Sequence, residues 1–209
     1  MEARWLVKFS ALALCQVLLM SVPILAALRQ RTRSTVALSM AVVLMSACAP
    51  THNWREVRHE QAPGALLMPC KPERAVRMSP ILGEGTAPVA LSMLSCRAGG
   101  QTFAWAVMPV PAGASPEVVV TAWRRAAWAS LQQPVSAEGG VPPGWQALQA
   151  AASTLPDRWA GPGLDHRGQP IRASIAWGRH EGWIHQAAVY GEAVPAEVLD
   201  TFWSNWSPQ

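Results

Sequence analysis

The feature that most constrains this chain is an apolar N-terminal quarter that ends at a cysteine. Residues 5–28 are apolar apart from one lysine, one glutamine and a few serines, and 24 residues are enough to cross a bilayer as a helix. A basic segment follows at 29–33, and a second apolar run at 36–45 leads to Cys48. The sequence therefore predicts a membrane-targeting leader at 1–47 and an exported part that begins at Cys48.

The second apolar run has the layout of a secretory signal. About ten apolar residues stand between basic residues and a cleavage point with small side chains. The segment Met45-Ser46-Ala47-Cys48 resembles the lipobox of bacterial lipoproteins, with methionine where leucine is usual. This resemblance implies a lipoprotein signal at 29–47 and diacylation of the Cys48 sulfur. The alternatives are an ordinary signal peptide cut by another peptidase and an uncleaved anchor.

The first apolar run allows two interpretations. Either translation begins between Met20 and Arg29, or residues 5–28 form a transmembrane helix whose C-terminal arginines stay in the cytoplasm. A leader of 47 residues is longer than the usual length of about 15 to 30, which favours the later start. A real helix at 5–28 would make the chain an integral inner-membrane protein with a periplasmic domain.

The lipoprotein resemblance also implies a location. Ala49, and not aspartate, follows Cys48. By the sorting habits of enteric lipoproteins, this residue implies the outer membrane. We therefore expect the chain at the periplasmic face of a cell membrane, and at the outer membrane if Cys48 carries lipid.

The charge of the exported part argues against nucleic-acid binding. The formal net charge is +4, but residues 1–47 hold five basic and one acidic side chain, so the part from Cys48 onward holds twelve of each. Binding to phosphates requires clustered basic residues. The arginines of the exported part alternate with carboxylates instead: Arg124, Arg125, Arg158, Arg167, Arg172 and Arg179. We expect no nucleic-acid partner.

The exported part alternates short strand patterns with two helix patterns. Residues 48–64 predict a tether with a short first element at 54–58, and residues 65–209 predict a globular domain. Alternating or apolar runs bounded by turn residues predict these strands: 65–68, 75–78, 88–96, 101–110, 171–177 and 183–190. Helices are expected at 115–133, where Ser115 and Pro116 form a start signal, and at 195–206. Hairpins without strand-helix-strand repetition predict an α+β fold, with an antiparallel sheet packed against one long and one C-terminal helix.

The end of the chain carries a second resemblance. Two strand patterns, the first ending in Ala176-Trp177 and the second in 186–191, lead to a helix with the aromatic pair Phe202-Trp203. This ending resembles that of small exported PsbP-like domains. The resemblance implies a sheet flanked by helices that serves as an accessory or binding module.

Two further cysteines lie in the exported part. Cys70 ends a predicted strand and Cys96 precedes a predicted turn. In a compartment that oxidises thiols we expect them to be bonded, with Cα atoms roughly 4.4 to 6.8 Å apart. The alternatives are two buried free thiols and a metal or redox pair, although the chain has no C-x-x-C motif.

Histidines give two weak candidate sites. His180 and His185 flank a predicted turn beside Glu181, where a surface metal site is conceivable, but two solvated side chains are the favoured interpretation. Asp165 and His166 are adjacent in sequence and could be read as a catalytic dyad. Neighbouring loop residues usually point apart, however, and the sequence has no G-x-S-x-G or comparable nucleophile motif. We expect no metal, no cofactor and no catalytic residue.

Tryptophan is abundant, with 11 residues in the chain and ten of them after Cys48. Trp123 and Trp128 are five apart, about 140° around a helix, so we expect that they do not both face one core. Trp203 and Trp206 can share a face. These rings either fill a small core or form an exposed platform for a glycan, a peptide or a membrane surface.

Together these patterns predict a role and no reaction. We expect a non-enzymatic lipoprotein that binds or supports an envelope protein, peptide or glycan and contacts the membrane through lipid or its N-terminal helix. The alternatives are an integral inner-membrane protein and a cryptic envelope hydrolase. A hydrolase would require His166 or His180 against a carboxylate and an exposed nucleophile.

Overall fold

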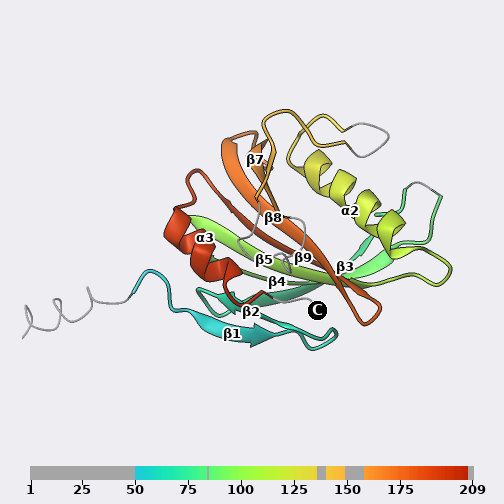
Figure 1. Ribbon diagram of the computed structural model, residues 1–209, viewed down its shortest axis with the longest axis horizontal. Helices are drawn as coiled ribbons and strands as arrows, with labels where there is room; N and C mark the ends of the chain where they lie inside the picture. Colours follow the sequence, from blue (N-terminus) through green and yellow to red (C-terminus); the bar gives the residue numbers. More distant parts are fainter. Residues whose placement is uncertain (1–49, 84, 136–139, 149–157, 207–209) are drawn as a thin grey trace, which may run out of the picture. The chain divides into compact units, whose positions relative to one another are not determined.

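The structure is a computed structural model that describes residues 50–83, 85–135, 140–148 and 158–206 (Figure 1). The chain divides after Pro50, and the second unit comprises Thr51–Gln209. No helix within the described ranges is long and apolar enough to cross a membrane. The predicted leader, with its possible span at 5–28, and the predicted lipid site at Cys48 lie outside those ranges.

The second unit is built on a seven-stranded antiparallel sheet in the order β3-β4-β5-β9-β8-β7-β6, beside a two-stranded sheet of β1 and β2. The strands are β1 (Arg55–Arg58), β2 (Ala65–Met68), β3 (Glu73–Ser79), β4 (Val89–Ala98), β5 (Gln101–Pro109), β6 (Gln146–Ala147), β7 (Arg158–Leu164), β8 (Pro170–His180) and β9 (Trp183–Gly191). The helices are α2 (Pro116–Ser130) and α3 (Ala196–Trp203).

Two-residue turns close the two long hairpins. Gly99 and Gly100 join β4 to β5 with φ of 57° and 80°, the positive values that a type I′ turn needs. Glu181 and Gly182 join β8 to β9 with φ of 47° and 80°. Both hairpins therefore lie where the sequence predicts turns, and their strands extend to the turn residues.

The large sheet has a core on each face. Along β9, Ala187 and Val189 pack into one cluster while Ile184 and Ala188 pack into the other, as the two-residue period of a strand requires. The first cluster also holds buried residues of β2 and α3, and the second holds those of α2. Figure 1 shows α2 and the β1–β2 hairpin on opposite sides of the sheet.

Helix α2 begins as the sequence predicts. The Ser115 side chain accepts a hydrogen bond of 3.3 Å from the Val118 backbone N–H, and Pro116 occupies the first turn. The helix ends at Ser130, a few residues before the expected end.

The predicted α+β fold class is wrong, because the described residues are mostly β. They form nine strands and only two short helices, of 15 and 8 residues. The sequence predicts no strand at β7, because its residues RWAGPGL contain two glycines and a proline. Pro162 is tolerated because β6 pairs only with Trp159 and Ala160, so the outer edge of β7 is open at Pro162.

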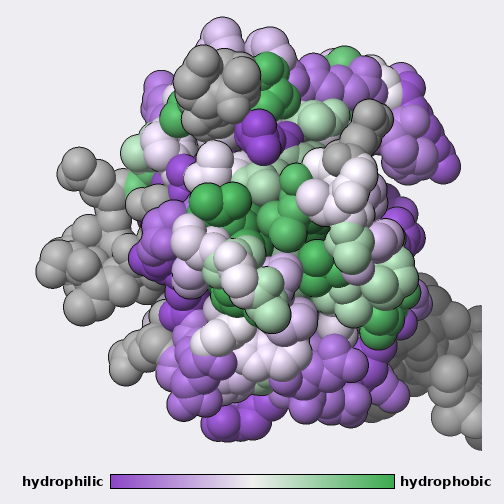
Figure 2. All heavy atoms as spheres, turned by 90° about the vertical axis from the view of Figure 1, so that its right-hand side faces the viewer, coloured by the Kyte–Doolittle hydropathy of each residue, from purple (hydrophilic) through white to green (hydrophobic). Residues whose placement is uncertain are grey.

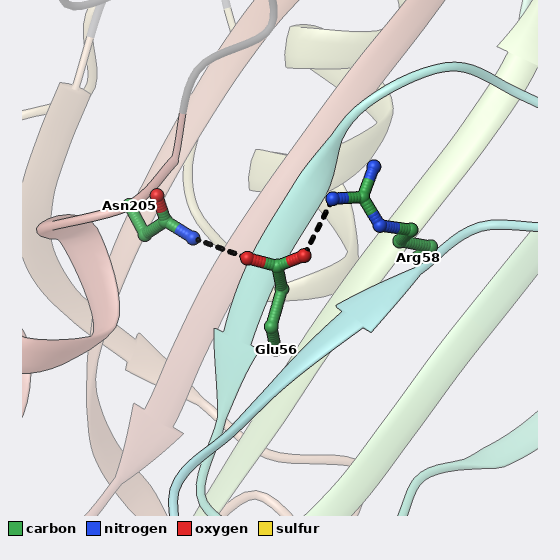
Figure 3. Close-up of polar contacts among 3 residues, drawn as sticks. All are labelled: Glu56, Arg58 and Asn205. Atoms are coloured by element: carbon green, nitrogen blue, oxygen red, sulfur yellow. Dashed lines mark hydrogen bonds and ion pairs between the residues drawn. The ribbon is translucent and has the colours of Figure 1, made fainter.

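Strand β1 lies at the short first element expected within the tether, at 54–58. It pairs with β2 from Arg55↔Met68 to Arg58↔Ala65. Glu56 of β1 contacts Arg58 at 2.7 Å and accepts a hydrogen bond of 3.3 Å from the Asn205 amide (Figure 3). Because Asn205 follows α3, the Glu56 carboxylate connects the small sheet to the end of the last helix.

Candidate functional site

A groove with a volume of about 940 Å³ opens at one end of the large sheet. Three of its lining residues, Arg97, Thr102 and Tyr190, lie side by side on β4, β5 and β9, because Arg97 pairs with Thr102 and Thr102 with Tyr190. The rest is lined by the β7–β8 hairpin, by Gln133 just after α2, and by Gly100, Gly191 and Glu192 beside the ends of β5 and β9. The groove therefore combines strand residues with a turn and a helix end.

The turn between β7 and β8 is held by Asp165. Its Oδ1 accepts hydrogen bonds of 2.8 Å from the backbone N–H groups of both Arg167 and Gln169. The bond from Gln169 is the main reason that the pKa of Asp165 lies below its usual value, and the bond from Arg167 acts in the same direction. The carboxylate thus fixes the turn, and His166 contributes only a smaller electrostatic effect, which also lowers the Asp165 pKa.

The same turn is fastened to the end of α2. The Leu164 backbone N–H donates to the Leu131 carbonyl at 3.0 Å, and the Gln132 side-chain amide donates to the Asp165 carbonyl at 3.1 Å. A Cβ on Gly163 would lie 3.0 Å from the Leu131 Cβ, so the strand approaches the helix end closely. The β7–β8 turn, which forms one wall of the groove, is therefore held by the Asp165 carboxylate and by the end of α2.

Two arginines give the groove its charge. Arg97 and Arg172 are exposed, and neither has a hydrogen-bond or ion-pair partner among the described residues. The carboxylate of Glu192 lines the groove as well. Tyr190 is half-buried, and burial raises its pKa to about 12. Its phenol is therefore protonated at neutral pH and can donate a hydrogen bond.

Sequence reasoning missed these residues as a group. The turn signal at 97–100 places Arg97 opposite Thr102, so that pair was accessible from the sequence. The pairing of β5 with β9, which adds Tyr190, joins residues almost ninety positions apart. No local pattern signals such a contact.

The histidines differ from the sequence expectation. His185 is fully buried and stacks on Trp105, with ring centroids 6.0 Å apart, so the solvated interpretation is wrong for this residue. Neither of its ring nitrogens has a hydrogen-bond partner among the residues that the structure describes. Burial, with smaller contributions from His180 and His59, lowers its pKa to about 4. In the part of the chain that the structure describes, no three His, Cys, Asp or Glu side chains converge as metal ligands.

Tryptophan fills the two cores. None of the ten tryptophans in the described ranges is exposed, which argues against an aromatic platform there. Trp123 and Trp128 both join the cluster under α2, against expectation, because the loop Trp145 and the strand Trp177 surround the Trp128 ring. Trp203 and Trp206 pack together as predicted, with ring centroids 5.3 Å apart.

The predicted disulfide is confirmed. Cys70 and Cys96 are bonded, with Cα atoms 6.0 Å apart, within the predicted range. The bond joins the segment between β2 and β3 to β4. It therefore anchors the start of the edge strand β3 to its neighbour in the sheet.

Comparisons with protein-family models, with characterised proteins and with solved structures find no match to this chain.

Proposed function

We propose that this protein is a lipid-anchored periplasmic module that binds a polar, carboxylate-bearing component of the cell envelope in the groove. The observation that carries the binding proposal is the pair of arginines, Arg97 and Arg172, which line one groove and have no hydrogen-bond or ion-pair partner within the described ranges. A guanidinium is a planar fork of donors that matches a carboxylate in two parallel hydrogen bonds.

The lipobox-like segment, the disulfide and Ala49 all support the proposed location. The lipobox-like segment before Cys48 directs the chain across the inner membrane and places lipid at the start of the exported part. The disulfide between Cys70 and Cys96 fits an oxidising compartment such as the periplasm. Ala49 after the lipid site favours the outer membrane as the destination.

The rest of the groove suits a polar ligand. The Tyr190 phenol can donate a hydrogen bond, and the side-chain amides of Gln133 and Gln169 can both donate and accept. Asp165 is engaged by its own turn, so its charge is partly satisfied. The arginines are therefore the groups most available to an acidic ligand.

Binding of soluble peptidoglycan fragments, which carry carboxylates on peptide and sugar, tests this proposal by titration calorimetry. We expect the double variant Arg97→Ala/Arg172→Ala to bind at least tenfold more weakly than the wild type, a loss of about 1.4 kcal/mol. Arg167→Ala is the matched control, because this arginine belongs to the same turn and does not line the groove. Equal binding by the wild type and the double variant would contradict the proposal.

A further inference from the structure

The edge strand β3 is open to a partner. It pairs with β4 on one side, from Glu73↔Ser95 to Ser79↔Val89, and it is the terminal strand of the sheet. Six of its seven residues are exposed. An edge strand presents a row of backbone N–H and C=O groups that a further strand can bind.

The sequence of β3 leaves that row unblocked. The strand has no proline or glycine, and its pairing with β4 runs without a bulge. Val76 and Met78 expose 61% and 64% of their surface and lie on the same face of the strand, two residues apart. Arg77 and Arg74, which forms an ion pair of 2.6 Å with Glu60, are charges of the kind that prevent pairing with unspecified strands. The edge therefore suits a partner whose charges match.

A second copy of the same strand provides such a match. Two identical strands that pair antiparallel around a twofold axis must place one residue opposite itself if their outward backbone groups are to meet. With Ala75 at the axis, Glu73 of each copy lies opposite Arg77 of the other, and Pro72 lies opposite Met78. Opposite charges at such positions stabilise the pair of strands.

The other symmetric registers lack this complementarity. An axis at Arg74 or at Arg77 places two guanidiniums opposite each other. An axis at Glu73 places two carboxylates opposite each other, and an axis at Val76, Met78 or Ser79 leaves Glu73 without a basic partner. The register centred on Ala75 is therefore the one that the charges of β3 select.

We propose that β3 pairs with β3 of a second copy in this register and joins two seven-stranded sheets into one continuous sheet. An apolar patch borders the new strand pair on the α2 side: half-buried Leu91 and Val89 of β4 lie opposite Arg77 and Ser79 of β3. Figure 2, the view onto the right-hand side of Figure 1, shows apolar side chains gathered within a polar rim on that face. The patches of the two copies flank the twofold axis.

Charge reversal in the full-length chain, purified in detergent, tests the pairing by analytical ultracentrifugation. We expect the wild type to dimerise, and Glu73→Arg or Arg77→Glu alone to raise the dissociation constant at least roughly tenfold, because each replaces two attractive pairs with two repulsive ones. The double variant Glu73→Arg/Arg77→Glu should dimerise again.

Mixing the two single variants gives the sharpest result. Glu73→Arg supplies two arginines and Arg77→Glu supplies two carboxylates, so a one-to-one mixture should form a heterodimer with a lower dissociation constant than either variant has alone. Arg167→Glu, a charge reversal at a turn remote from β3 in the sheet order, is the control and should dimerise like the wild type. A monomeric wild type, single variants that dimerise normally, or a mixture that stays monomeric would each overturn the proposal.

Discussion

Burial of His185 should make the stability of the folded domain depend on pH. The side chain is 0% exposed and lies against Trp105, and neither ring nitrogen has a hydrogen-bond partner in the described part of the chain. Its pKa is lowered from 6.5 to about 4, first by burial and then by the nearby His180 and His59. Replacing this ring with one that cannot titrate is the informative perturbation.

The sign and size of the effect follow from linkage. Between pH 4 and pH 6.5 the unfolded chain binds a proton at His185 that the folded chain does not, so stability falls as the pH decreases. For these two pKa values, the free energy of unfolding should be about 2 kcal/mol lower at pH 5 than at pH 7.5, and about 3 kcal/mol lower below pH 4. Burial lowers the pKa of His59 as well, which adds to the effect in the same direction.

Urea unfolding of residues 51–209 at pH 5 and pH 7.5 measures this difference. His185→Phe retains an aromatic ring against Trp105 and removes two unpartnered nitrogens, so we expect it to lose most of the pH dependence and to be at least as stable as the wild type at pH 7.5. His166→Gln, at an exposed turn, should retain the dependence. In thermal unfolding, the wild-type difference corresponds to about 4 to 8 °C.

Two results would refute this reasoning. The wild type could show equal stability at both pH values, which would mean that the folded protein accommodates a proton on His185. Alternatively, His185→Phe could keep the full dependence, which would assign it to other groups.

Further predictions concern the disulfide, the core, the helix cap and the membrane. Cys70→Ser with Cys96→Ser should lower the free energy of unfolding by about 3 kcal/mol without abolishing the fold, and the wild type should resist alkylation until reduced; free thiols in untreated protein would contradict this. Trp128→Ala should cost about 3 to 5 kcal/mol in urea unfolding, and a cost below 1 kcal/mol would deny its place in the core. Ser115→Ala should cost about 1 kcal/mol, whereas no change would show that its cap is dispensable. In sucrose gradients the full-length protein should migrate with the outer membrane, and migration with the inner membrane would contradict that location.

Local signals predicted the hairpins and helices of this fold well. The glycine pair at 99–100 and the turn around Gly182 predicted the β4–β5 and β8–β9 hairpins, because glycine readily adopts the positive φ that a two-residue turn requires. The structure has positive φ at these positions. Ser115 and Pro116 identified the start of α2 for an equally local reason. These signals act over a few residues, so the sequence is enough to detect them.

Other parts depended on contacts between distant segments. β7 forms in spite of Pro162 and two glycines because β8 supplies a complete pairing partner along it. Trp128 is buried together with Trp123 because Trp145 and Trp177 close around it from other elements. Neither environment is encoded by spacing within one element, which is why β7 and the shared core of Trp123 and Trp128 were not predicted.

The candidate groove shows the same division. The sequence offered Asp165 and His166 as a candidate dyad, yet the Asp165 carboxylate accepts hydrogen bonds from two backbone N–H groups and stabilises the turn. Arg97 and Tyr190 carried no motif, and the sheet brings them to one end through the neighbouring strands β4, β5 and β9. Their chemistry therefore became visible only with the strand order.

Metabolic labelling with a clickable fatty acid tests most directly whether the domain is held at the membrane by lipid on Cys48. Wild-type protein and a Cys15→Ser control, whose substitution lies in the predicted leader, should both be labelled, whereas Cys48→Ser should not. Mass spectrometry of the labelled protein should show a chain that begins at the acylated Cys48. Equal labelling of Cys48→Ser, or a membrane-bound chain that retains residues 5–28 and carries no lipid, would contradict the proposed lipoprotein and favour an integral membrane anchor.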